Sequence, residues 1–437
     1  MKLKTADLII YGLVLIQPIA PVGIFGIANV LSHGHVTSSI LLAMVAMMLT
    51  ALSYGRLAAL YPSSGSAYSY VTGAFNPIAG YIVGWAMFLD YLIIPIVSSI
   101  YAALTLHRLI EGVPFWVWVS LVIGLAVLLN LGGISSLARA NKALLAVMTV
   151  IIVAFLYLAA HFLYSAHGWH GLLSIKPMYD PATFDLRAIM TATSLAALTY
   201  IGFDGVTTLA EEANNPRRSV PLATVSVRLL TGLLSAVEVY LAQLAWPDYH
   251  SYPNNETAFL DVTRLVGGPA LFTAMGVILV VACFGTALTS LAGAARLLGG
   301  MARDNVLPAR WFAGRTARNI VLLGVVALIG ALSLSYEQTA ELINYGAFLA
   351  FMGVNLACTR VFLPRSRNWT QKVLLDAGVP LAGFLFCFLI WWSLPRAAQI
   401  AGSVWLAAGA LQLVFRRGIT PTHSAELPMD PPSQRGA

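Results

Sequence analysis

Charged residues are scarce in this chain. Asp, Glu, Lys and Arg together make up 10% of its 437 residues, whereas 59% of the residues are hydrophobic. Soluble globular domains carry about 25% charged residues, so the composition excludes an ordinary water-soluble enzyme or binding module. Cysteine is scarce as well. The three cysteines, Cys283, Cys358 and Cys387, all fall within apolar stretches and predict no disulfide framework.

Catalytic and metal-binding motifs are also missing. The sequence contains no HExxH, no GxSxG and no paired Cys and His ligands. An intramembrane enzyme is therefore a distant alternative. His33 and His35 flank Gly34 in a predicted turn without further ligands, so we expect no metal site and no cofactor.

Long apolar stretches recur along almost the whole chain, and the mean hydropathy is +0.80. A helix needs about 20 mostly apolar residues to cross the hydrocarbon core of a membrane. The first stretch is too long for a signal peptide and contains Pro18 and Pro21, so we interpret it as a helix. We predict an all-α polytopic membrane protein with twelve transmembrane helices: 8–31, 38–60, 77–106, 115–133, 141–164, 188–212, 223–245, 268–300, 320–335, 339–362, 373–394 and 398–415.

Lys and Arg residues are distributed unevenly between the two sides of the predicted bundle. Twelve spans put both termini on one side, and that side holds twenty of the 25 Lys and Arg residues, Arg228 among them. The opposite side holds Arg108, Lys176, Arg187, Arg264 and Arg396. The positive-inside rule then places both termini in the cytoplasm and the chain in a bacterial-type inner membrane. The pI of about 9.3 reflects this bias and contact with anionic membrane lipids, so it implies no nucleic-acid partner.

Two of the predicted spans are interrupted in their middles. In the first, Pro18 and Pro21 lack the amide hydrogen that a helix interior needs. In the sixth, Gly202 and Gly205 flank Asp204. Kinks that only shape packing are the alternative, but matched breaks five spans apart favour two inverted repeats. The predicted parts are a first repeat over 1–164, an external loop over 165–187, a second repeat over 188–362, two further helices over 363–415 and a disordered cytoplasmic tail over 416–437.

An interrupted helix leaves free N–H groups at one half-helix end and free C=O groups at the other. These groups can bind a carboxylate or an ammonium group near the midplane of the membrane. Aromatic side chains such as Trp85 could add packing and cation–π contact to an amine. The predicted substrate-binding residues are Ala20, Val22, Gly23, Ile24, Gly26, Tyr91, Tyr200, Gly202, Phe203 and Asp204.

Several motifs resemble those of the amino acid-polyamine-organocation permeases, most closely the putrescine importers. They lie at residues 53–57 (SYGRL), 61–68 (YPSSGSAY), 84–85 (GW), 89–91 (LDY), 202–212 (GFDGVTTLAEE), 215–221 (NPRRSVP), 301–308 (MARDNVLP) and 342–347 (LINYGA). The resemblance implies a LeuT-type fold of two inverted five-helix repeats with broken helices 1 and 6, plus two peripheral helices. It also implies alternating access, with uptake driven by protons or by the membrane potential.

The chain departs from the putrescine importers at two points. Gly23 stands where the resemblance implies an aspartate in the unwound part of span 1. The region around Val147 and Met148 is apolar, where some proton-coupled permeases carry a lysine. Two ammonium groups need two counter-charges in a site of low dielectric constant. We therefore expect a substrate with one amine to be preferred over putrescine, unless Glu238 supplies the second charge.

Three carboxylates lie inside predicted spans: Asp90, Asp204 and Glu238. Ionisable groups at membrane depth usually face a cavity or a partner, so all three are candidates for proton coupling. Asp204 handles the substrate amine or a proton, caps the half-helix after it, or does both. Glu238 is either a proton site or a protonated side chain hydrogen-bonded across helices. For Asp90 a structural hydrogen bond is favoured.

Three charged residues near the cytoplasmic end of span 6 are gate candidates. Glu211 and Glu212 lie close to Arg217 in the sequence, and ion pairs or simple solvation fit them equally. Together these features predict a secondary active transporter that imports a small amine-bearing solute, coupled to H⁺. A diamine importer driven largely by the membrane potential is the alternative. A channel is a distant alternative, because a channel would need a ring of selectivity groups.

Overall fold

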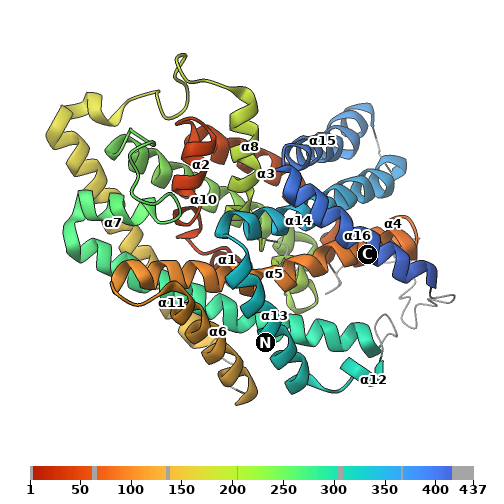
Figure 1. Cartoon of the computed structure of the whole chain (residues 1–437). Coiled ribbons are helices and arrows are strands. Elements are labelled where there is room, and N and C mark those ends of the chain that lie inside the picture. Colours follow the sequence, from red (N-terminus) through yellow and green to blue (C-terminus); the bar gives the residue numbers. More distant parts are fainter. Residues whose placement is uncertain are drawn as a thin grey trace.

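The computed structural model of the chain describes residues 3–61, 66–133, 138–203, 205–303, 309–365 and 368–415. These residues fold into helices, with one isolated bridge between Leu3 and Ala213. Figure 1 shows the helices gathered in one bundle, with α2 surrounded by later helices; most residues of α2 are buried.

The longer helices are α1 (Thr5–Ile16), α3 (Val36–Leu60), α5 (Pro77–Leu109), α6 (Phe115–Leu131), α7 (Ala138–Leu172), α8 (Leu186–Ala196), α10 (Pro216–Ala245), α11 (Ala258–Arg303), α13 (Thr316–Ser333), α14 (Tyr336–Phe362), α15 (Val379–Trp392) and α16 (Arg396–Phe415). The shorter elements are η1 (Ala20–Val22), α2 (Phe25–Leu31), α4 (Ser66–Ala74), η2 (Ala197–Tyr200), α9 (Gly205–Thr208), η3 (Ala210–Glu212), α12 (Ala309–Phe312), η4 (Leu363–Arg365) and the π-helical η5 (Gln371–Gly378).

Many of these helices are suited to a membrane. Within the described residues, ten helical segments are long and apolar enough to cross one, and Thr5–Val14 and Phe115–Leu131 are apolar but shorter. Exposed apolar side chains such as Leu128 and Val150 cover the outside of the bundle. A helix that is apolar on its outer face needs lipid as its solvent. The chain is therefore a multi-pass membrane protein.

The first predicted break is present. α1 ends at Ile16, and Gln17 then adopts a positive φ of 64°. Pro18 cannot continue the helical hydrogen bonding, so the chain makes the short 3₁₀ turn η1 before α2 starts at Phe25. This irregular backbone is buried in protein, which is the condition for tolerating it at membrane depth.

The second predicted break is also present. α8 passes into the 3₁₀ turn η2, which ends at Tyr200, and Gly202 follows with a φ of 107°. Residues with a side chain rarely adopt this conformation. The chain resumes as the single helical turn α9, so the span is split into separate short pieces.

Hydrogen bonds and ion pairs join distant parts of the bundle. The Leu3 amide donates to the Glu212 carbonyl at 2.9 Å, which ties the start of the chain to the end of the sixth predicted span. Among the described residues, ion pairs link Arg56 with Asp376 and Arg108 with Asp261. Because Asp376 is fully buried, the removal of one partner of its pair would be costly.

The loop over residues 246–257 covers α2, which is the second half of the first broken span. The Asn29 side-chain amide donates to the Tyr252 hydroxyl at 2.7 Å. Phe25 packs against Tyr252 and Phe259, with ring centroids 5.8 and 5.5 Å apart. At Gly26, any side chain would collide with the Asn255 carbonyl. The glycine at this position therefore permits the close approach of the loop.

Candidate functional site

A cavity of about 480 Å³ lies between the two broken spans. It is lined by residues of α1, α5, α11 and α14 and by the irregular segments beside η1 and η2. Its polar side chains are Tyr11, Gln17, Asp90, Tyr91, Ser98, Tyr101, Thr286, Thr289, Ser290 and Tyr336. Among the described lining residues Asp90 alone carries a formal charge, and the others provide hydroxyl, amide and apolar groups. The cavity can therefore bind a small polar solute largely through neutral donors and acceptors.

The two ends of the cavity differ in exposure. Tyr11 and Tyr91 are 39% and 38% exposed, whereas Tyr101 and Tyr336 are only 3% and 6% exposed. The buried end lies beside Gly23, at the level where the loop over 246–257 closes over α2. The structure thus has a cavity that is open at one end and closed at the other.

Two tyrosines form the closed end. The rings of Tyr101 and Tyr336 are 5.0 Å apart, and a Cβ atom at Gly23 would lie 2.5 Å from the Tyr336 hydroxyl oxygen. The Tyr101 hydroxyl has no hydrogen-bond partner in the described part of the chain. A buried polar group of this kind costs free energy unless a ligand or water satisfies it. Nearby, burial raises the pKa of Glu256, while its hydrogen bond from the Tyr336 backbone lowers it.

The predicted substrate-binding residues fall into two groups. Ala20, Gly23, Tyr91 and Gly202 line the cavity. Val22, Ile24, Gly26, Tyr200 and Phe203 do not, and their side chains or Cα atoms are buried against other helices. Trp85 does not line the cavity either. It stacks on Trp405 of α16, with ring centroids 4.8 Å apart. Residues from both broken spans and one of the aromatic residues, Tyr91, therefore share the cavity.

Asp90 is the described carboxylate that lines the cavity. It lies on α5 and is 7% exposed. Its Oδ1 would be 3.0 Å from a Cβ atom at Gly346 of α14, so the carboxylate also packs at a helix–helix contact. This position fits either a structural group or a solute ligand.

Arg228 is a buried charged residue beside the site that the sequence reasoning missed. It lies on α10 and is fully buried. Its Nη1 donates to the Tyr200 carbonyl at 2.7 Å, and its guanidinium carbon lies 3.8 Å from the centroid of the Phe203 ring. The charge count placed Arg228 on the cytoplasmic side, and the structure buries it inside the bundle. Its position within the predicted span 223–245 was the signal that could have identified it.

Glu238 is also fully buried on α10, and neither carboxyl oxygen has a hydrogen-bond partner among the described residues. Val227 is on the side of α10 that meets α1, because its side chain would lie 2.7 Å from a Cβ atom at Gly12. Glu238 follows Val227 by eleven residues, about three helical turns. It therefore lies on the same face of α10 as Val227.

The remaining predicted residues bear on proton handling and gating. Asp204 lies outside the described residues, and so does the side chain of Glu211. Glu212 and Arg217 are exposed, and the ion pairs of the described residues do not include them. In this region the backbone of Leu3 forms hydrogen bonds with the backbone of Glu212 and Asn214.

Metal-ligating side chains do not gather in the described part of the chain, where no group of three His, Cys, Asp or Glu residues could hold an ion. His35 has a structural contact: its Nε2 accepts a hydrogen bond from the Asp180 amide at 3.0 Å. Its Nδ1 lies 3.0 Å from the Ser32 carbonyl, so the imidazole links a helix start to a loop.

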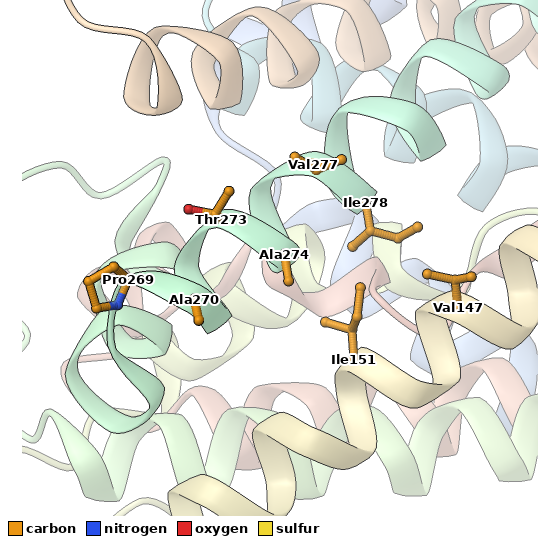
Figure 2. A pocket seen from close by; sticks show the side chains of 8 residues that line it. All are labelled: Val147, Ile151, Pro269, Ala270, Thr273, Ala274, Val277 and Ile278. Atoms are coloured by element: carbon orange, nitrogen blue, oxygen red, sulfur yellow. The ribbon is translucent and has the colours of Figure 1, made fainter.

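A second cavity, of about 680 Å³, is an open groove between α7 and α11 (Figure 2). Val147 and Ile151 project from α7 toward Ile278 of α11, and Thr273 is the one polar residue of the lining. Val147 and Val277 are 49% and 51% exposed. Such a surface suits acyl chains and offers no counter-charge to an amine. The cavity between the broken spans is therefore the candidate site.

Broken helices that enclose a cavity within a multi-pass bundle define a membrane transport protein rather than an enzyme. The sequence profile of the amino acid permease family matches residues 13–411, and the chain belongs to this family. This confirms the resemblance to the amino acid-polyamine-organocation permeases.

Three relatives illustrate the family. The low-affinity putrescine importer PlaP of Escherichia coli (strain K12) is 30% identical over 421 residues, which cover 94% of this chain and 92% of that protein. The branched-chain amino acid permease BcaP of Lactococcus lactis is 26% identical over 404 residues, covering 86% and 85%. The methylthioribose transporter of Bacillus subtilis is 24% identical over 403 residues, covering 85% and 84%. The names of these relatives indicate three different kinds of solute.

Proposed function

We propose that the chain is a secondary active transporter that imports a small solute with one amine, an amino acid or a monoamine, across a bacterial-type inner membrane together with H⁺. The observation that carries this proposal is the cavity of about 480 Å³ between two broken helices. Its size and its polar lining suit a solute of a few carbon atoms.

The proposed transport cycle is alternating access in a LeuT-type arrangement of twelve spans, with two inverted five-helix repeats. The cavity is exposed near Tyr11 and Tyr91 and buried near Tyr101 and Tyr336. Both termini are proposed to be cytoplasmic, so the open end, on the side of α1, faces the cytoplasm. Rocking of one repeat against the other would then open the end beside Gly23.

The preference for one amine is supported by the charges around the cavity. A diamine has two ammonium groups, and each needs a counter-charge where water is excluded. Gly23 provides no carboxylate, and the Tyr336 hydroxyl occupies the space beside it. Tyrosine hydroxyls can donate hydrogen bonds to a carboxylate and accept them from an amine. The closed end therefore suits an amino acid better than a second ammonium group.

Transport by purified protein in proteoliposomes tests the proposal. A thermal-shift screen of amino acids, diamines and monoamines first identifies ligands, because a bound ligand stabilises the folded protein by mass action. Labelled ligands are then tested for saturable uptake and counterflow. An inward pH gradient should stimulate the uptake of a neutral amino acid without sodium. Unsaturable flux without counterflow would indicate a channel, and a strict sodium requirement would contradict proton coupling.

A diamine importer driven by the membrane potential is the second candidate, favoured by the 30% identity to PlaP. A dication that moves inward gains about 4.6 kcal/mol per 100 mV, twice the roughly 2.3 kcal/mol of a monocation. A zwitterion gains nothing from the potential. Accumulation of putrescine in response to voltage alone would therefore support this second candidate.

We expect an added carboxylate at Gly23 to shift the preference toward diamines. Gly23 has an ordinary helical φ of −69°, so the backbone accepts a side chain, but the Tyr336 hydroxyl blocks its Cβ. The informative variant is therefore Gly23→Asp combined with Tyr336→Phe. We expect its putrescine preference, measured by competition against the best amino acid ligand, to rise about tenfold or more.

Tyr336→Phe alone is the matched control, because it removes the hydroxyl and adds no charge. It should keep the original preference order. If the control shifts the preference as much as the double variant does, the effect comes from the tyrosine and not from the new carboxylate.

A further inference from the structure

One face of α11 runs along the cavity. Its lining residues are spaced three or four positions apart, which places them on one side of a helix: Leu279, Cys283, Thr286, Ser290 and Gly293, with Thr289 beside them. Gly293 lies at the open end, because a Cβ atom there would be 3.9 Å from the exposed Tyr91 ring. We call the three hydroxyl residues between Cys283 and Gly293 the hydroxyl face of α11: Thr286, Thr289 and Ser290.

The hydroxyl face presents hydrogen-bond acceptors to the cavity. Each hydroxyl has one hydrogen, and a backbone carbonyl can only accept. All three hydroxyls donate this hydrogen to a carbonyl of the preceding helical turn: Thr286 to Ala282, Thr289 to Gly285 and Ser290 to Thr286, at 3.1, 2.9 and 2.6 Å. The lone pairs of the hydroxyl oxygens are left for N–H or O–H groups in the cavity.

A side chain of the first broken span already uses one of these acceptors. The Gln17 side-chain amide donates through Nε2 to Thr286 Oγ1 at 3.1 Å. The reverse orientation of the amide would need a hydrogen from Thr286, and that hydrogen is donated to the Ala282 carbonyl. Gln17 follows the end of α1 with a φ of 64°, which is uncommon for a residue with a side chain. The break therefore holds an N–H donor against the hydroxyl face.

The other two hydroxyls keep their acceptors for a solute. In the described part of the chain, the side-chain hydrogen bonds of Thr289 and Ser290 are those to their own helix. Both residues line the cavity, where Ser290 is half-buried and Thr289 is exposed. A primary ammonium group has three N–H donors and no acceptor. It is therefore the part of an amine solute that complements these two oxygens.

We propose that Thr289 and Ser290 form the amine-binding subsite of the cavity, which selects a primary amine over a quaternary ammonium group of the same charge. The inference rests on the proposed transport function and deepens it, because it assigns the amine of the solute to α11. The two oxygens act as hydrogen-bond acceptors, so the subsite discriminates by the number of N–H donors and not by charge.

Equilibrium binding to the purified full-length protein tests the subsite without requiring transport. Isothermal titration calorimetry gives dissociation constants for three primary amines, each paired with its N,N,N-trimethyl derivative: butylamine, alanine and 4-aminobutyrate. The two members of a pair carry the same charges and differ in N–H donors. The wild type should bind the primary amine of a pair at least about tenfold more tightly, because the trimethyl compound cannot donate to the two oxygens.

Thr289→Val nearly keeps the shape of the side chain and removes its acceptor. The ratio of the two dissociation constants in a pair should therefore fall about tenfold, and further when Ser290→Ala is added. Thr149→Val and Ser120→Ala are the matched controls. Both hydroxyls also donate to the carbonyl four residues earlier, but they lie on α7 and α6, outside the cavity lining. These controls should keep the wild-type ratio.

Equal binding of the two members of each pair by the wild type would overturn the inference. An unchanged ratio in Thr289→Val and in the double variant would also overturn it, and if the double variant does not fold, Thr289→Val decides alone. In both cases the wild type still binds amines, so the proposed function stands. If none of the three primary amines binds to the wild type, the proposed function fails and the inference fails with it.

Discussion

Asp204→Asn is expected to reduce uptake to background while the protein still inserts into the membrane in normal amount. Asp204 is outside the described residues, but Gly202 and Gly205 on either side of it line the cavity. Asparagine has nearly the same shape as aspartate and lacks its charge. A hydrogen bond to a charged group contributes about 1.5–3 kcal/mol, so its loss would weaken amine binding by at least about tenfold. The measurement is initial uptake in proteoliposomes, normalised to the amount of inserted protein.

A helix-capping role for Asp204 predicts a different outcome. Asparagine caps a helix about as well as aspartate does, so Asp204→Asn would then keep both its thermal stability and its uptake. Asp185→Asn is the matched control, because the Asp185 side chain caps α8 by accepting from the Arg187 amide at 2.8 Å. Normal uptake by Asp204→Asn, with a thermal stability as little changed as in Asp185→Asn, would reduce Asp204 to a cap.

Much of the helical architecture could be predicted from the sequence. The predicted span 77–106 corresponds to α5 (Pro77–Leu109), and the predicted break after Ile16 is present. The pattern works because a membrane helix requires a continuous apolar stretch. It failed where polar residues lie inside a helix: α7 continues past residue 164 through Ser165 and His167 to a kink at Gly168, which has a φ of 60°. Hydropathy measures the transfer of side chains into lipid and not the backbone conformation. It therefore does not show where such a helix ends.

The site was only partly predictable, because its decisive contacts join residues far apart in the chain. Glycine and proline marked the breaks, since their effect on the backbone is local. Nothing local indicates that Tyr336 fills the space beside Gly23, or that Phe203 and Tyr200 cover Arg228. Arg228, near the start of the predicted span 223–245, was counted with the residues of the cytoplasmic side. Its burial depends on packing between helices, which a single sequence does not reveal.

Glu238 is the second carboxyl group whose replacement should have a large effect. It is fully buried on α10, on the same face as Val227, and its two oxygens have no hydrogen-bond partner in the described part of the chain. The described ion pairs do not include it. An isolated buried carboxylate is so costly that the group is held as the neutral acid. If the environment becomes polar in another state of the transport cycle, the same group can release its proton.

We therefore expect Glu238→Gln to separate transport from proton coupling. Glutamine has the shape of the protonated acid and cannot release a proton, so counterflow exchange should continue at a rate close to that of the wild type. An inward gradient of one pH unit provides about 1.4 kcal/mol per proton, which sustains at most about tenfold accumulation of a neutral amino acid. This accumulation should be lost in Glu238→Gln.

Glu111→Gln is the matched control, because Glu111 is an exposed carboxylate in the loop between α5 and α6. It should accumulate solute as the wild type does. Both activities are measured in the same proteoliposomes, so that a loss of protein cannot be mistaken for a loss of coupling. If Glu238→Gln accumulates a neutral amino acid in response to the pH gradient as well as Glu111→Gln does, another group carries the proton. Loss of counterflow together with accumulation would instead show that Glu238 is needed for the transport cycle itself.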